Sequence, residues 1–316
     1  MMGRRAVLTL SLAALLLAAC GAGGVRLPST LAPGQLPAMP GAATAAPGEA
    51  QPGDDGARLA VPGAPPGSSE AGDSALESIG PSLEGRPIAV WRFGEGPRRV
   101  VLVGGIHGGF EANSALLAEM LVDHFYAHPE DVLPGIQLVL IPVANPDGLV
   151  RGRGVEARFN AAGVDLNRNW GCEWSETAIL QDMPIDPGAG PFSEPESRAL
   201  RDFFIAEQPD AVVFYHSAAG GVFTGACGDD HPPAHWLGEL LEEATGYPYG
   251  VFDHYEVTGD ATNWLAEQGI PAAIVELNTQ TEPEFEQNLP GVHALQCRLT
   301  TAGGSDPAVQ RLCPSS

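Results

Sequence analysis

The chain has 316 residues, of which 44% are hydrophobic and 7% aromatic, enough for a sizeable core. Acidic residues number 39 and basic residues 16, and the resulting net charge of −23 disfavours binding to nucleic-acid phosphates. All the basic residues are arginines, and the absence of lysine excludes P-loop nucleotide hydrolases, Schiff-base enzymes and pyridoxal-phosphate enzymes.

The first residues are typical of an exported lipoprotein. Arg4 and Arg5 precede an apolar stretch over residues 6–19 that is too short to span a bilayer comfortably. This stretch leads directly into Cys20, and its LAAC ending resembles a bacterial lipobox. We interpret residues 1–19 as a lipoprotein signal peptide and expect lipid on Cys20 to anchor the chain to a bacterial membrane, outside the cytoplasm. An ordinary secretory signal with a chance cysteine is the alternative, and it predicts the same compartment.

Residues 20–75 are rich in Ala, Gly, Pro and Ser, a composition that cannot bury enough apolar surface to offset its ordering entropy. We expect this segment to be a disordered tether between the membrane and a domain that starts at residue 76. Four cysteines follow in that domain, and an even number in an oxidising compartment predicts disulfides. Three pairings are possible, among them Cys172 with Cys227 and Cys297 with Cys313.

Residues 76–316 alternate between strand and helix patterns. Strands are predicted at 87–92, 99–105, 137–143, 211–215 and 272–276. Helices are predicted at 112–127, from a capping box at 193–196 to 206, at 233–245, at 261–268 and at 283–299. The alternation predicts an α/β fold, a three-layer sandwich with a mixed, largely parallel central sheet flanked by helices.

Three of the predicted strands lead directly into ionisable residues, namely His107, His216 and Glu276. Ligands of open α/β sheets bind at the carboxyl ends of the strands, so these side chains can converge although they are far apart in sequence. Glu111 follows His107 across a glycine-rich turn. Histidine and glutamate are ordinary zinc ligands, and a catalytic zinc commonly takes three of them. His216 is the natural third ligand, whereas a single histidine at a strand end is more often a satisfied structural group.

Further motifs give this constellation its context. The segments are NPDG at 145–148, NAAGVDLNRNW at 160–170, YHS at 215–217 and VELN at 275–278, together with an opening IGPSLEGRPI at 79–88. In this order, together with HGGFE at 107–111, they resemble the M14 zinc carboxypeptidase family over roughly residues 77–298. The branch of bacterial members that act on murein peptides looks most similar.

The resemblance implies a role for each residue of the constellation. His107, Glu111 and His216 would hold one zinc ion, and Glu276 would be the general base that takes a proton from the attacking water and later protonates the leaving amine. Arg158 would stabilise the carbonyl oxyanion, with Arg151 and Arg153 as competitors for this place. Asn167 and Arg168 would bind the terminal carboxylate of the substrate, Tyr255 would close over it, and Asp165 would orient a zinc-binding histidine.

One departure from the family pattern concerns the first pair of ligands. The family usually has two residues between the histidine and the glutamate, but three residues separate His107 from Glu111. We expect Gly108 and Gly109 to accommodate the additional residue in the turn. The other histidines are assigned to the surface or to packing, and they are His124, His128, His254 and His293, with a metal pair at His231 and His235 disfavoured by the adjacent prolines.

The sequence therefore predicts a lipid-anchored zinc metallopeptidase that hydrolyses a C-terminal or diaminopimelate-type bond in a peptide or murein peptide. A related zinc deacylase or amidase acting on small N-acyl amino acids is one alternative. A catalytically inactive binding lipoprotein is another, although the intact Glu276 and both histidines argue against it.

Overall fold

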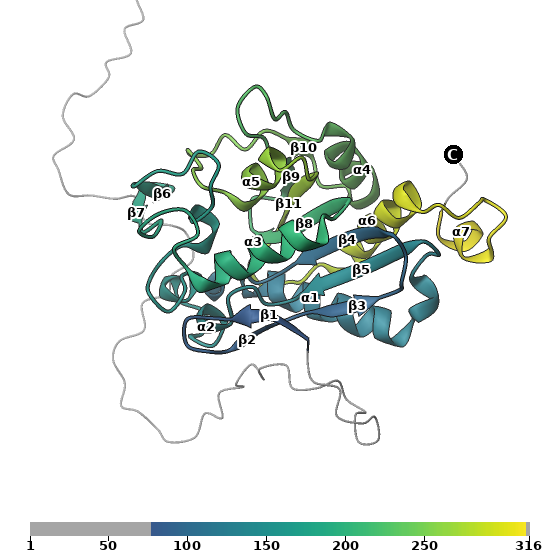
Figure 1. Cartoon of the computed structure of the whole chain (residues 1–316), viewed down its shortest axis with the longest axis horizontal. Helices are drawn as coiled ribbons and strands as arrows, with labels where there is room; N and C mark the ends of the chain where they lie inside the picture. The colour runs from purple at the N-terminus through teal and green to yellow at the C-terminus, as the bar shows by residue number, and fades with distance from the viewer. Residues whose placement is uncertain (1–76, 314–316) are drawn as a thin grey trace, which may run out of the picture. The chain divides into compact units, whose positions relative to one another are not determined.

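The computed structural model describes residues 77–313, so the predicted signal peptide, the tether and Cys20 lie outside the described residues. A seven-stranded sheet in the order β10-β9-β11-β8-β4-β5-β3 forms the centre of the described domain (Figure 1). Its strands are β3 (Trp91–Phe93), β4 (Arg98–Val103), β5 (Ile136–Ile141), β8 (Ala211–Ser217), β9 (Gly221–Thr224), β10 (Tyr249–Gly250) and β11 (Ala272–Leu277). The central strands are parallel, whereas β3 is antiparallel to β5 and β9 is antiparallel to β11. The predicted mixed, largely parallel sheet is confirmed.

Helices flank both faces of the sheet. They are α1 (Ala112–Ala127), α2 (Pro146–Leu149), α3 (Pro195–Glu207), α4 (His235–Thr245), α5 (Ala261–Glu267), α6 (Phe285–Leu299) and α7 (Pro307–Leu312). Short 3₁₀ turns are η1 (Gly109–Glu111), η2 (Pro129–Asp131), η3 (Val155–Arg158) and η4 (Leu166–Arg168). In the described part of the chain, no helix combines the length and apolarity needed to cross a membrane.

Alternating side chains of the central strands enter two separate cores. In β4, Val100 and Leu102 pack with helices α1, α4 and α6, whereas Val101 and Val103 pack with α3 and α5 on the other face. This period of two follows from strand geometry, and both faces are apolar because both are covered by helices. The three-layer sandwich is thereby confirmed.

The predicted strand at 87–92 is two strands in the structure. β2 (Pro87–Ala89) pairs with β1 (Ser78–Pro81) in a small separate sheet, and β3 joins the edge of the main sheet. Val90 lies between them and donates its backbone N–H to Glu77. The apolar pattern of this segment does not reveal the break, because strands in two different sheets can share one continuous alternation.

The predicted capping box at the start of α3 is wrong. Glu194 is the N-cap and makes no capping hydrogen bond, and the Ser193 hydroxyl donates to the Glu194 carboxylate at 2.8 Å. Glu196 accepts hydrogen bonds from the Leu83 amide at 2.8 Å and from Asn160 at 3.3 Å. Tertiary partners therefore occupy the carboxylate that a capping box requires.

The sequence prediction did not include the strands β1, β9 and β10 or the helix α2, and it also lacked a hairpin and the helix α7. A hairpin of β6 (Ala178–Leu180) and β7 (Met183–Ile185) lies between η4 and α3, and α7 follows α6 near the end of the chain. The disulfides choose among the three possible pairings. Cys172 is bonded to Cys227, and Cys297 is bonded to Cys313, which ties α7 to α6.

Replacement of the fully buried Leu102 by alanine should lower the free energy of unfolding by about 2–5 kcal/mol, because it leaves a cavity in the core beside β4. The control is Leu116→Ala on α1, where the side chain is 38% exposed and alanine favours the helix, so we expect about 0.5 kcal/mol or less. Urea denaturation at a fixed metal concentration measures both values. Equal losses in the two variants would contradict the buried position of β4.

Candidate metal centre and substrate cleft

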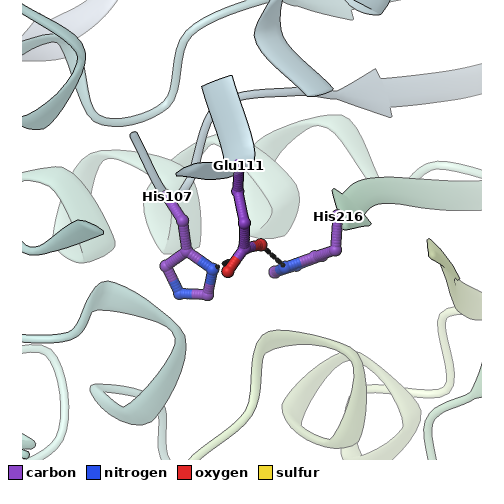
Figure 2. Close-up of side chains that lie close together, drawn as sticks. All are labelled: His107, Glu111 and His216. Atoms are coloured by element: carbon purple, nitrogen blue, oxygen red, sulfur yellow. Dashed lines mark hydrogen bonds and ion pairs between the residues drawn. The ribbon is translucent and has the colours of Figure 1, made fainter. Parts of the chain in front are cut away.

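The sheet brings His107, Glu111 and His216 together at the carboxyl ends of β4 and β8. One donor atom from each of these buried side chains lies within 4.8 Å of the others. The Glu111 carboxylate lies between the two imidazole rings (Figure 2), with its Oε2 atom 3.1 Å from Nδ1 of His107 and 3.1 Å from Nδ1 of His216. Two imidazole nitrogens and a carboxylate oxygen in this arrangement are a suitable ligand set for zinc.

The unusual spacing between the first two donors is accommodated by the glycines. Gly109 has φ of +65°, a left-handed conformation that glycine adopts without strain. A Cβ atom on Gly108 would lie 2.6 Å from the backbone oxygen of Ala157, so this turn approaches η3 too closely for any side chain. The extra residue is therefore accommodated in the turn that includes η1, and Glu111 still reaches both histidines.

The ring nitrogens that do not face Glu111, Nε2 of His107 and Nε2 of His216, have different environments. Nε2 of His107 lies 3.0 Å from Oδ1 of Asp165, so that this carboxylate fixes the ring with Nδ1 directed at Glu111. Nε2 of His216 is buried and has no hydrogen-bond partner among residues 77–313. A carboxylate on the outer nitrogen of a histidine is the usual arrangement around a metal ligand.

Arg158 is buried between the same two acids. Its Nε atom donates to Oδ2 of Asp165 at 2.8 Å, and its Nη1 atom contacts Oε1 of Glu111. The charges of Arg158 and His107 hold the pKa values of Glu111 and Asp165 well below their usual range, although burial opposes this shift. The two acids are therefore ionised at neutral pH, and for Glu111 this is the form that metal coordination requires.

Glu276 lies beside His216, because the two residues are partners in the parallel pairing of β11 with β8. Its Oε2 atom accepts a hydrogen bond of 3.1 Å from the Ala219 amide. Burial raises the pKa of the Glu276 carboxyl, and the nearby Glu111 adds to this effect, while His216 opposes it. Glu276 is thus a carboxylate with raised basicity at the edge of the metal cluster.

A cleft of about 1250 Å³ opens over this cluster, and every predicted site residue lines it. Its lining includes His107, Glu111, His216, Glu276, Arg158, Asn167, Arg168 and Tyr255. The two competing arginines do not line it. Arg151 donates to the backbone oxygen of Asn160 at 3.1 Å, and Arg153 is exposed.

Asn167 and Arg168 present polar groups to the cleft wall. The Asn167 side chain donates to Asp260 at 2.8 Å and accepts from the Ala261 amide at 3.1 Å, which fixes it to the start of α5. Its amide nitrogen carries a second hydrogen, which has no acceptor among residues 77–313 and could bind a ligand. The Arg168 side chain donates from Nη1 to the Asn167 backbone oxygen at 2.7 Å, and its buried Nε atom has no partner within the described residues.

The Asn113 side chain connects segments beside the cleft by hydrogen bonds, a role that the sequence did not predict. Its amide donates to the backbone oxygens of Thr279 and Glu282, at 2.7 and 3.0 Å, and accepts from the Ser217 hydroxyl at 2.8 Å. These bonds join the start of α1 to the last residue of β8 and to the loop after β11. No local pattern marks Asn113, because its partners lie more than 100 residues away.

Asp165→Asn should destabilise the metal-free protein by about 3–5 kcal/mol, because it leaves buried charge on Arg158 without one of its partners. The control is Glu77→Gln, which removes a half-exposed partner of Arg92 and should cost about 1 kcal/mol or less. Urea denaturation in the presence of a chelator gives both values.

Wild type and Asp165→Asn, compared over a range of pH, also test the pKa of Asp165. Because this pKa is lowered in the folded state, the stabilisation is complete above the unfolded value of about 3.9 and is lost as the pH falls through the folded value. The stability gap between wild type and Asp165→Asn should therefore narrow as the pH is lowered below about 4. A gap that stays constant down to the acid transition would contradict the assigned ion pair.

Comparison with known proteins identifies the family to which the chain belongs. The family model for zinc carboxypeptidases, Peptidase_M14, matches residues 71–286. The murein peptide amidase A of Escherichia coli K12 is 35% identical over 133 residues, which cover 39% of this chain and 50% of that protein. Carboxypeptidase A6 of Mus musculus is 29% identical over 234 residues, 62% of this chain and 53% of that protein. The chain thus spans about half the length of these curated relatives.

Solved structures share the fold. Bovine thrombin-activatable fibrinolysis inhibitor, in complex with a tick carboxypeptidase inhibitor, superposes with a TM-score of 0.60 at 20% identity, over 71% of this chain and 89% of that one. The murein-tripeptide amidase of Escherichia coli O157 gives a TM-score of 0.51 at 24% identity, over 70% of this chain and 94% of that one. With its matching family model and its carboxypeptidase fold, the chain belongs to the Peptidase_M14 family of zinc carboxypeptidases.

Proposed function

We propose that this protein is a zinc-dependent metallopeptidase that hydrolyses the amide bond next to a residue with a free carboxylate. The observation that carries this proposal is the position of Glu276 beside a buried cluster of three metal-ligating side chains, in one cleft with Arg168. His107, Glu111 and His216 would hold one zinc ion. When bound, zinc would supply Lewis-acid chemistry, which polarises a carbonyl and lowers the pKa of water.

The side chains of the cleft would perform the remaining steps. Glu276 would take a proton from the attacking water and deliver it to the leaving amine, a task suited to a carboxylate of raised pKa. Arg158 would hold its guanidinium near the carbonyl oxygen as negative charge develops there. Asn167 and Arg168 would bind the substrate carboxylate, and Tyr255 would close over it.

The substrate class is proposed from the same residues together with the relatives. A guanidinium at the cleft wall favours a product that carries a free carboxylate, as the C-terminal residue of a peptide does. The similarity to murein peptide amidase A supports a murein stem peptide as the natural substrate, cleaved at a diaminopimelate-type bond. Inactive metallocarboxypeptidases of fungi are also among the relatives, so the presence of the fold alone does not carry the activity.

Replacement of Glu276 by glutamine should lower kcat by about 10²–10⁴-fold, because the amide cannot accept the proton of water. The protein should keep its zinc content, measured by elemental analysis, and its fold. Glu256→Gln is the matched control, since Glu256 also lines the cleft but lies outside the cluster. Removal of metal by a chelator should abolish hydrolysis by the wild type, and added zinc should restore it. Near-normal kcat in Glu276→Gln would refute the assigned base.

Arg168→Gln should weaken the hydrolysis of substrates with a free C-terminal carboxylate by about 10–150-fold in kcat/KM, the value of one charge-assisted hydrogen bond. The measurement is a panel of C-terminally varied peptides and murein stem peptides, each as the free acid and as the C-terminal amide. The wild type should prefer the acids and the variant should lose that preference. If small N-acyl amino acids are cleaved best, the deacylase alternative replaces the peptidase.

The location of the protein is proposed from its first twenty residues alone. Cys20→Ser in the full-length chain should move the protein from the membrane fraction to the soluble fraction of bacterial cells, because the lipid-bearing thiol is lost. Immunoblots of the two fractions, with and without lipid labelling, provide the measurement. Membrane association that is unchanged by this substitution would contradict the lipid anchor.

A further inference from the structure

A second group of metal-ligating side chains lies away from the cleft. His124 is near the end of α1, Asp131 belongs to η2, and His293 is in the middle of α6. One ring nitrogen of each histidine and one carboxylate oxygen of Asp131 lie within 4.8 Å of one another. His124 is twelve residues along α1 from Ala112, roughly 18 Å at 1.5 Å per residue, so this group is separate from the catalytic cluster.

The two oxygens of the Asp131 carboxylate contact different side chains, His124 and Arg311. Oδ2 lies 3.0 Å from Nε2 of His124, and Oδ1 accepts a hydrogen bond of 2.7 Å from Arg311 of α7. Carboxylates that bind a metal through one oxygen are commonly hydrogen-bonded through the other. Arg311 thus orients the carboxylate and leaves Oδ2 directed at His124.

The environment of the His293 ring also points to a bound ligand. Its Nε2 atom is buried and has no hydrogen-bond partner among the described residues. A buried ring nitrogen without a partner loses the hydrogen bond that it makes with water in the unfolded chain, so a ligand at this position would be favoured.

We propose that His124, Asp131 and His293 form a second, structural site for a divalent transition metal, with zinc as its ion. Two imidazoles and one carboxylate suit zinc, and the partial exposure of His124 and Asp131, 15% and 13% of their side chains, leaves access for the ion and for a water as fourth ligand. The ion would join α1, η2 and α6. Through Arg311 it would also hold α7, which the Cys297–Cys313 disulfide ties to α6.

Zinc stoichiometry tests this site in the full chain. Wild-type protein equilibrated in a zinc buffer should contain two zinc ions per chain by elemental analysis, whereas His293→Gln and Asp131→Asn should each contain one. His128→Gln is the matched control, because His128 is an exposed histidine outside the group and its replacement should leave two ions. One ion per chain in wild type and in all three variants would overturn the proposal.

A second measurement separates this site from the catalytic one. A His107→Ala/His216→Ala variant lacks two catalytic donors but should still bind one cobalt(II) ion, with visible absorption, and zinc should raise its Tm. Adding His293→Gln should abolish the Tm increase and weaken cobalt binding at least about 10-fold. If the double variant does not fold, cobalt titration of wild type against His293→Gln decides between two ions and one. Equal cobalt binding by these two proteins would overturn the site.

Discussion

The candidate metal centre depends on the pairing of the buried charges around Arg158. Glu111 and Asp165 are both buried carboxylates, and each is in contact with the guanidinium and with His107. Charges in such a site are tolerated only when they are paired and hydrogen-bonded. The pairing holds the carboxylates ionised and fixes the histidine ring, so the residues that stabilise the cluster also prepare it to bind a cation.

The sheet adds the second requirement, which is that the reactive groups come from different parts of the chain. His216 and Glu276 end neighbouring parallel strands and are register partners, while His107 follows the next strand, β4. Strands with apolar side chains on both faces are rigid supports, because their cores are filled on either side. The loops at their carboxyl ends are then free to carry the polar residues of the cleft.

The two metal-ligating groups differ in a way that fits different tasks. The group in the cleft has a basic carboxylate and two arginines beside it, so a bound substrate would meet acid–base and anion-binding groups at once. The group at His124 does not line the cleft, has Arg311 bonded to its Asp131, and lies among helices near the Cys297–Cys313 disulfide. The first arrangement favours chemistry, and the second favours stabilisation of packing.

The sequence by itself determined the main strands and helices along the chain, the layered fold and eight of the side chains that line the cleft, because hydrophobic periodicity and short motifs are local signals. It identified His107, His216 and Glu276 from their positions at strand ends. Only the tertiary structure decided the disulfide pairing, the position of Arg158 but not Arg151 in the cleft lining, and the distant partners of Asn113 and His293. Those features depend on contacts between residues far apart in the chain, and no local pattern encodes which distant partner a polar side chain will meet.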